Sequence, residues 1–408
     1  MDATGRDFCL KVLFNLQSLS PPRTGIGLYT QHLIEALAAT GEIDTLAGFL
    51  GGRILEGEAF ATLLRTEPSA GATSSRKGTS KLRAIKSMVR RIPGAYPVRQ
   101  ALLEWQNQRH IAKLAKTGLI YHEPNYIPVR YDGPLVITAH DLSQVRHPEF
   151  HPPQRAAFLN KHLGPALHRA DQVITDSVFS ANEIMDVYQI SAEKITVTHL
   201  GAANIFRPRT ALETDKTLQD LGLRYRGFVL FVATLEPRKN ILRLIDAHSA
   251  LSASLRKEYP LVLTGAAGWQ DSDILHKVKA AEERGETIRT GYLPIEQLAD
   301  LFSAAAVFCY PSLYEGFGLP VLEGFASGTP VLTSNITSMP EISAKAAIEI
   351  DPYSVEAITH GLQTLLEDHA LADKHRQAGL LRSQDFSWRN CAEKTLEVYK
   401  RLSPSARG

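Results

Sequence analysis

The segment from Ser312 to Ser334, SLYEGFGLPVLEGFASGTPVLTS, holds two carboxylates on either side of a glycine-rich turn. Glu315 precedes the turn, and Glu323 falls about one turn inside the helix that Pro320 is well placed to begin. Glycines in the turn let backbone N–H groups approach a ligand closely. Because carboxylates accept hydrogen bonds from hydroxyl groups, often two at once, this spacing favours a ligand such as a sugar ring.

A second segment, FVATLEPRKNILRLIDA, places two cations at the carboxyl end of a predicted strand. Arg238 and Lys239 immediately precede an amphipathic helix, where acidic side chains are the usual preference. A bound anion would resolve this conflict, because guanidinium groups pair with phosphate oxygens and Lys adds a point charge. Plain solvent exposure of both side chains is the alternative. Phosphate donors and hydroxyl acceptors in one pocket would describe a site for a nucleotide sugar.

A third segment, Gly25-Ile26-Gly27, follows a proline-containing loop and opens a helix. Glycines there allow a phosphate to approach the helix N-terminus, and a tight turn that begins a helix is the alternative. Thr30 occupies the place of the third glycine of a dinucleotide fingerprint, which disfavours an oxidoreductase. No Gly-Lys-Ser/Thr follows, so the P-loop pattern is absent as well.

Short apolar segments alternate with longer helical patterns along most of the chain, which is typical of βαβ units and parallel sheets. Ligands of such sheets bind outside the carboxyl ends of the strands, so two facing doubly wound domains would form a cleft there. The predicted strands are Lys11–Asn15, Thr45–Phe49, Leu119–His122, Leu135–Ala139, Gln172–Asp176, Ile195–His199, Phe228–Val232, Leu261–Thr264, Ile288–Gly291, Val307–Tyr310 and Pro330–Thr333. The predicted helices are Ile26–Ala39, Gln154–Arg169, Phe179–Tyr188, Asn240–Ser252, Ile295–Ala306, Pro320–Ser327, Ser354–Glu367 and Trp388–Leu402.

Length and composition indicate the number of domains and the cellular location. The 408 residues exceed the range in which one hydrophobic core keeps growing, so two domains are expected. Cys9, Cys309 and Cys391 are widely spaced and odd in number, which indicates a reducing, cytoplasmic location. We expect no signal peptide and no membrane span, because no stretch approaches eighteen uninterrupted apolar residues.

The net charge of +2 conceals a strongly basic segment at residues 76–117. Eleven Lys or Arg against one acid, Glu104, give this segment +10 and leave −8 for the rest of the chain. Such segments often contact anionic surfaces, including lipid headgroups. Four apolar residues recur in it at helical spacing: Leu82, Ile85, Met88 and Val89. An interfacial amphipathic helix and a solvated surface excursion are both compatible with this pattern.

Taken together, these residues resemble a known family. Glu315-Gly-Phe-Gly-Leu-Pro-x-x-Glu323 is similar to the Glu-x7-Glu signature of retaining glycosyltransferases of family four, which have the two-domain GT-B fold. Supporting matches cover nearly the whole chain: GIGLY, ITAHDLSQVRHPEF, ITDSVFSANEI, ITVTHLGAANIFRP, VATLEPRKNI and TGYLPIEQLADLFSAA. The GIG, HDL and EPRKN versions look most like bacterial mannosyl- or rhamnosyl-type transferases that build surface polysaccharides.

The resemblance implies a role for each matching residue. Arg238 and Lys239 would hold the donor diphosphate, and Glu323 would accept from the ribose hydroxyls. Glu315, with backbone groups of Gly316, Phe317 and Gly318, would engage the hydroxyls of the transferred sugar. A strand-end turn remains the alternative for His140 and Asp141. The implied catalytic residues are His140, Arg238, Lys239 and Glu315. The implied donor-binding residues are Gly25, Gly27, Tyr292, Leu293, Gly316, Phe317, Gly318, Leu319 and Glu323, and the implied acceptor-binding residues are Tyr29 and Asp141.

The resemblance also implies the domain plan and the substrates. Residues 1–205 would form the acceptor-binding domain, 206–385 the nucleotide-sugar-binding domain, and 386–408 a helix that crosses back to the first domain. A GDP-sugar, mannose or rhamnose, is the favoured donor, with UDP- or dTDP-sugars as alternatives. The expected acceptor is a glycan, lipid-linked at the inner face of the cytoplasmic membrane, in lipopolysaccharide O-antigen biosynthesis; no nucleic acid partner is expected.

Transfer with retention, without a metal or other cofactor, is the implied mechanism. Asp271 and Asp273 suggest a metal-dependent alternative, although aspartates after a Gly-Trp loop more often cap the following helix. A catalytically silent sugar-nucleotide-binding subunit of a glycan-assembly complex is a further alternative from a different class.

Overall fold

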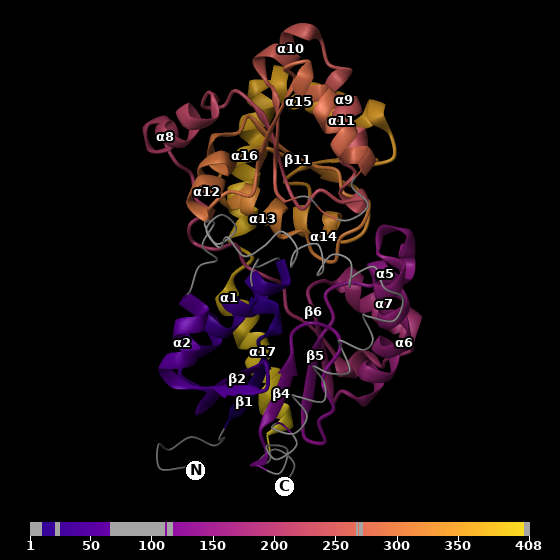
Figure 1. The fold of residues 1–408 in the computed structure, drawn as a ribbon. Helices are drawn as coiled ribbons and strands as arrows, with labels where there is room; N and C mark the ends of the chain where they lie inside the picture. The colour runs from indigo at the N-terminus through magenta and orange to yellow at the C-terminus, as the bar shows by residue number, and fades with distance from the viewer. Residues whose placement is uncertain are drawn as a thin grey trace, which may run out of the picture.

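The computed structural model describes residues 10–20, 25–65, 111, 117–266, 268 and 272–403. The described chain forms two α/β domains, one above the other in Figure 1. The basic segment 76–117 lies almost entirely outside the described residues, as does Asp271.

The N-terminal domain is built on a sheet of strand order β3-β2-β1-β4-β5-β6-β7, in which only the β2–β3 pair is antiparallel. Its strands are β1 (Lys11–Asn15), β2 (Thr45–Leu50), β3 (Arg53–Leu55), β4 (Ile120–Glu123), β5 (Leu135–Thr138), β6 (Gln172–Thr175) and β7 (Ile195–Val197). Its helices are α1 (Gly25–Thr40), α2 (Gly57–Arg65), α5 (Ser143–Arg146), α6 (Pro153–Arg169) and α7 (Val178–Tyr188).

The C-terminal domain is built on a parallel sheet of order β10-β9-β8-β11-β12-β13. Its strands are β8 (Val229–Val232), β9 (Leu261–Thr264), β10 (Thr287–Gly291), β11 (Val307–Tyr310), β12 (Val331–Ser334) and β13 (Ile348–Ile350). Its helices are α8 (Ala211–Leu221), α9 (Ile241–Ser249), α10 (Ala253–Glu258), α11 (Ser272–Glu283), α12 (Ile295–Ala304), α13 (Leu319–Ala326), α14 (Met339–Ser343), α15 (Val355–Glu367) and α16 (His369–Ser383).

Each sheet has a point at which the strand order reverses, between β1 and β4 in one domain and between β8 and β11 in the other. Side chains at the carboxyl ends of the strands beside such a point surround the crevice that binds ligands in doubly wound sheets. The two carboxyl-end edges meet, because the Ser177 hydroxyl after β6 donates to the Gly316 carbonyl oxygen after β11 at 2.6 Å. The fold therefore brings both candidate crevices to one interface.

Helix α17 (Trp388–Leu402) crosses from the C-terminal domain and packs against α1, as the yellow helix among the N-terminal elements of Figure 1 shows. Ser387 begins it by accepting a hydrogen bond from the Asn390 backbone N–H. A Cβ on Gly201 would lie 2.3 Å from the Trp388 nitrogen, so only glycine fits beside this crossing. The predicted return of the C-terminal helix is confirmed.

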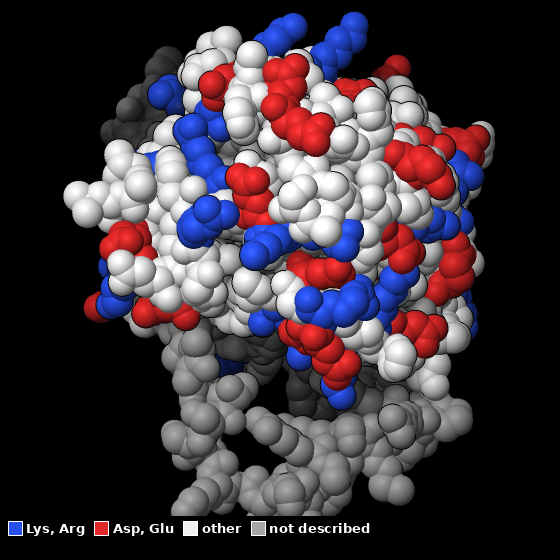
Figure 2. Space-filling model, turned by 90° about the horizontal axis from the view of Figure 1, so that it is seen from above, with Lys and Arg blue, Asp and Glu red and all other residues white. Residues whose placement is uncertain are grey.

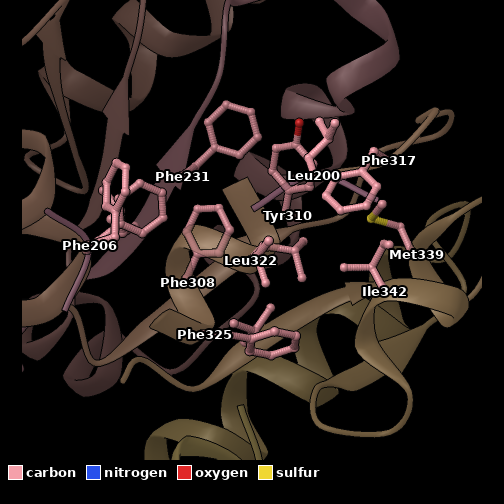
Figure 3. Packing of buried hydrophobic residues seen from close by; sticks show 14 of the residues in the cluster. Leu200, Phe206, Phe231, Phe308, Tyr310, Phe317, Leu322, Phe325, Met339 and Ile342 are labelled. Atoms are coloured by element: carbon pink, nitrogen blue, oxygen red, sulfur yellow. The ribbon is translucent and has the colours of Figure 1, made fainter. Parts of the chain in front are cut away.

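The C-terminal core lies directly behind the candidate site. Figure 3 shows aromatic residues of β8 and β11 packed against α13 and α14, with Phe231, Phe308 and Tyr310 close together. The ring of Phe308 stacks on Tyr310 with centroids 5.7 Å apart, and Tyr310 in turn stacks on Phe231 at 6.1 Å. This packing fixes the end of β11, from which the glycine-rich loop departs.

The exposed face in Figure 2 carries basic and acidic side chains interspersed, with no extended region of one sign. Among the described helices, none combines the length and the apolar character needed to cross a bilayer.

Candidate active site

The glycine-rich loop between β11 and α13 lies against the opposite domain. A Cβ on Gly316 would lie 2.1 Å from the carbonyl oxygen of His140, so any larger residue would push the domains apart. Gly318 has a φ of +94°, and a Cβ there would lie 2.2 Å from Met339 Cε. These glycines let the loop close on protein atoms, and the close approach of their backbone to a ligand stays a prediction.

Hydrogen bonds from both domains hold the backbone of this loop. From the C-terminal domain, Leu313 N–H donates to the Arg238 carbonyl at 2.8 Å and the Ser338 hydroxyl donates to the Glu315 carbonyl at 2.9 Å. From the N-terminal domain, Ser177 donates to the Gly316 carbonyl. The loop therefore has a fixed position relative to both crevices.

The side chain of Phe317 does not face the cleft. It is 4% exposed, contacts the Phe386 ring at 5.9 Å between centroids, and lies near Met339 and Ile342 in Figure 3. The ring of Phe317 therefore belongs to the core, and contact of its backbone with the donor stays a prediction. Leu319, the first residue of α13, is half-buried.

A buried ion cluster occupies the C-terminal side of the cleft. Glu315 Oε1 lies 2.6 Å from Lys239 Nζ and accepts from the Tyr310 hydroxyl at 3.0 Å. Its Oε2 lies 3.2 Å from Arg238 Nη1, and Arg238 Nε pairs with Glu236 at 2.5 Å. Neither cation is simply solvated: Lys239 is 7% exposed, the side chain of Arg238 is 19% exposed, and both pair with Glu315. This removes plain solvent exposure as the alternative for the pair.

Burial and charge compete in setting the pKa values of this cluster. Burial would raise the pKa of Glu315, but Lys239 and then Arg238 outweigh it and hold this pKa below its ordinary value. Burial and the charge of Arg238 lower the pKa of Lys239, although the nearby Glu315 carboxylate acts to raise it. Glu315 is thus an ionised carboxylate whose two oxygens are committed to cations and a hydroxyl, which is a binding arrangement and not that of a free nucleophile.

Glu323 has a different environment. It lies on α13, is 8% exposed, and has no hydrogen-bonding partner among the described residues. Burial raises its pKa to about 8. A buried carboxyl group without a partner is costly unless a ligand supplies one, so Glu323 is a strong candidate for contact with ligand hydroxyls.

His140 follows β5 on the N-terminal side of the cleft. Its ring is 8% exposed, and its Nδ1 lies 2.7 Å from Asp176 Oδ2. The side chain of Asp141 is held by the Ser143 backbone N–H at 3.0 Å and by the Tyr126 hydroxyl at 3.2 Å. Both residues lie in a strand-end turn, and their side chains also form hydrogen bonds with neighbouring elements.

The structure places Tyr29 behind His140 and not in contact with an acceptor. Tyr29 is 1% exposed, packs edge-on against the His140 ring at 4.7 Å, and bonds through its hydroxyl to Thr138 at 2.9 Å. The prediction of direct acceptor binding by Tyr29 is corrected to support of His140, because burial removes its hydroxyl from the cleft.

Four further residues assigned to the donor lie at the ends of elements. Gly25 and Gly27 are in the first turn of α1, and nothing lies within 4 Å of a Cβ built on Gly25. Tyr292, which follows β10, is 53% exposed, and Leu293 beside it is partly buried against the core. Their contacts with a donor stay a prediction.

Sequence reasoning did not assign several residues that organise the site. Glu236 and Tyr310 complete the ion cluster, while Asp176 and Ser177 hold His140 and the glycine-rich loop. Their shared signal is position: each lies at or just beyond the carboxyl end of a strand. Among the described residues, no group of three or more His, Cys, Asp or Glu is arranged to hold a metal ion. Asp273 lies in the first turn of α11, in keeping with helix capping.

The geometry defines a class of protein: two doubly wound domains that meet at the carboxyl ends of their strands, with Lys239, Arg238 and Glu315 on one side and His140 on the other, form a GT-B-type site. The family model described as "Glycosyltransferase Family 4" matches residues 23–202, and the one described as "Glycosyl transferases group 1" matches residues 216–382. The chain belongs to this glycosyltransferase family and is an enzyme of the hexosyltransferase class.

Similar proteins agree with that membership. An O-antigen chain mannosyltransferase B of Escherichia coli is 34% identical over 96% of this chain and 100% of its own length. The serotype-specific mannosyltransferase WbdA of Escherichia coli is 32% identical over 66% of this chain and 34% of its own length. The structure of Anabaena HepE in complex with UDP and glucose shares the fold with a TM-score of 0.67 at 18% identity, covering 96% of this chain and 99% of that one.

The buried carboxyl of Glu323 generates a stability prediction. Because its folded pKa of about 8 lies above the ordinary 4.5, its contribution to stability is full below pH 4.5 and is lost as pH rises through 8. Glu323→Gln should therefore stabilise the ligand-free protein by about 2–4 kcal/mol at pH 9, and by much less at pH 5. Urea unfolding at both pH values measures the difference.

Glu367→Gln, at an exposed position on α15, is the matched control and should leave the difference between pH 5 and pH 9 unchanged. A Glu323→Gln protein equally stable to the wild type at pH 9 would contradict the assignment of a costly buried carboxyl.

Proposed function

We propose that this chain transfers mannose from GDP-mannose, with retention of configuration, to a growing O-antigen glycan. The observation that carries the proposal is the end-to-end similarity to the Escherichia coli O-antigen chain mannosyltransferase B. The site supports it, because buried cations suited to a diphosphate lie beside carboxyl groups suited to hydroxyls. GDP-rhamnose, a UDP- or dTDP-sugar, and a catalytically silent subunit are the competing outcomes.

In this proposal the main chemical requirement is to stabilise the negative charge on the departing diphosphate. Arg238 and Lys239 bind it and stabilise the negative charge that develops as the bond to the sugar breaks. Glu315, already fixed by both cations, orients the sugar hydroxyls, and Glu323 accepts from the ribose. The acceptor attacks on the face from which the diphosphate leaves, and the diphosphate takes the acceptor's hydroxyl proton. No metal or cofactor is needed for charge stabilisation in this scheme.

Thermal unfolding with a panel of GDP-, UDP-, dTDP- and ADP-sugars tests the donor. GDP-mannose should raise the unfolding temperature most, because at equal concentration the ligand with the lowest Kd stabilises the folded state most. A ligand at 100 times its Kd contributes about 2.7 kcal/mol. The same panel is then scored for donor hydrolysis. A larger shift with a UDP- or dTDP-sugar would overturn the GDP assignment, and binding without hydrolysis of any donor would favour the silent subunit.

Removal of the Lys239 ammonium tests the phosphate assignment. Lys239→Ala should lower kcat about 100-fold or more, because a fixed charge aimed at the leaving group is lost from a buried site. Lys257→Ala, at an exposed position on α10, should keep wild-type turnover. Near-normal kcat in a folded Lys239→Ala protein would refute the assignment.

We also propose that the acceptor is lipid-linked at the inner face of the cytoplasmic membrane, where the basic segment 76–117 contacts anionic headgroups. The +10 charge of that segment is the supporting observation. Neutralising Arg90 and Arg91 together should weaken co-sedimentation with phosphatidylglycerol vesicles while donor hydrolysis continues. Unchanged vesicle binding would remove this role.

A further inference from the structure

The ring of His140 lies between two oxygen atoms that both accept hydrogen bonds. Its Nδ1 is 2.7 Å from Asp176 Oδ2, and its Nε2 is 2.9 Å from the Pro124 carbonyl oxygen. A carbonyl oxygen and a carboxylate have no hydrogen to donate, so the ring must donate from both nitrogens. A neutral imidazole carries only one N–H, and the geometry therefore requires the imidazolium form.

The surroundings of His140 favour that charge. Burial alone would lower the pKa of His140, but Asp176 from the end of β6, the Pro124 carbonyl and Asp141 raise it above its ordinary value. Tyr29 of α1 and Tyr126 of the loop after β4 face the ring edge-on, at 4.7 and 5.8 Å between centroids.

Arg238, from the opposite domain, acts on Asp141, whose pKa it holds below the ordinary value against the effect of burial. The imidazolium is thus surrounded by two carboxylates of its own domain.

His122 on the neighbouring strand β4 provides an internal comparison. Its two ring nitrogens face hydroxyl groups, Tyr399 at 2.6 Å and Thr138 at 2.7 Å, which can either donate or accept. Burial and the charge of His140 lower its pKa to about 3, so this ring is neutral. The two buried histidines differ because only His140 has a carboxylate partner.

The segment that contains Asp176 also fixes the backbone around His140. The Ser180 hydroxyl donates to the His140 carbonyl at 3.0 Å, and Ser177 donates to the Gly316 carbonyl at 2.6 Å. Gly316 is the residue whose Cβ would collide with the His140 carbonyl. One short segment therefore orients the ring of His140, its main chain, and the glycine-rich loop facing it.

We propose that Asp176 is a positioning residue that holds His140 as a fixed imidazolium beside the glycine-rich loop. His140 then supplies a positive charge beside the glycine-rich loop at neutral pH and does not act as a proton acceptor. In the transfer reaction the sugar–phosphate bond breaks, the bond to the acceptor oxygen forms, and the acceptor's proton goes to the departing diphosphate. The assignment rests on the proposed function for where the substrate lies, whereas the protonation state is a property of the free protein.

Ring-¹⁵N-histidine NMR of the free full-length protein tests the charge directly. The chain has 14 histidines, and the His140 signals are assigned by their absence from the spectrum of His140→Gln. At pH 7.5 both ring nitrogens of His140 should be protonated in the wild type. In Asp176→Asn the midpoint of deprotonation should fall by about one pH unit or more, because an adjacent opposite charge is removed.

Asp186→Asn is the matched control, since Asp186 lies on the exposed side of α7 with its side chain 69% accessible; the His140 midpoint should not move. A neutral His140 in the wild type at pH 7.5 overturns the proposal, as does an unchanged midpoint in Asp176→Asn. If Asp176→Asn does not fold, the wild-type titration decides alone.

The pH profile of turnover separates positioning from a merely structural role. The loss of kcat in Asp176→Asn relative to the wild type should be about tenfold greater at pH 8 than at pH 6, because the variant's ring loses its proton within this range. An equal loss at both pH values contradicts the proposal. If the wild type turns over no donor, the proposed function fails. The NMR experiment still decides the protonation state of His140, because it uses the free protein.

Discussion

The site depends on two cations at the carboxyl end of the C-terminal sheet, the buried Lys239 and the partly buried Arg238. Burial of Lys239 and Arg238 would be strongly unfavourable without an opposite charge, and Glu315 supplies it within hydrogen-bonding distance of both. The same carboxylate belongs to the glycine-rich loop, so charge compensation also fixes the loop. A diphosphate that enters this site meets cations that are already oriented, and it competes with Glu315 for them.

Contact between the domains is the second constraint, and it involves the same loop. The Glu341 carboxylate of α14 accepts from the Val178 and Phe179 backbone N–H groups at 2.9 and 3.1 Å, at the first turn of α7 in the other domain. His199 Nε2 lies 2.7 Å from the same carboxylate. These contacts, with those of Ser177, keep the His140 side of the cleft against the Glu315 side, so residues far apart in the sequence form one site.

Much of the fold could be predicted from the sequence, because alternating apolar segments of two lengths indicate parallel sheets, and strand ends indicate where ligands bind. Each predicted strand overlaps an observed one, and the crossing of α17 was anticipated. The edge strands β3 and β13 and the helices α2, α5, α8, α10, α11, α14 and α16 were not predicted. The shortest of these, β3, β13, α5, α10 and α14, have three to six residues, which carry too little periodic signal. The boundary between residues 205 and 206 stays a prediction.

Side-chain partners were the part that could not be predicted. The glutamates, Arg238, Lys239 and His140 were found from residue type and spacing, yet nothing in a single sequence shows that Glu315 pairs with a lysine 76 positions earlier. For the same reason the sequence placed Tyr29 at the acceptor, whereas packing against distant elements buries it. Partner choice depends on three-dimensional contacts that local patterns do not contain.

Calorimetric titration of GDP into Glu315→Gln tests the central claim most directly. If Glu315 compensates the cations that otherwise bind the diphosphate, its neutral isostere should bind GDP at least as tightly as the wild type does, while sugar transfer is lost. Weaker binding of GDP by a folded Glu315→Gln protein would contradict the claim, because the carboxylate would then support the diphosphate site and not compete with it.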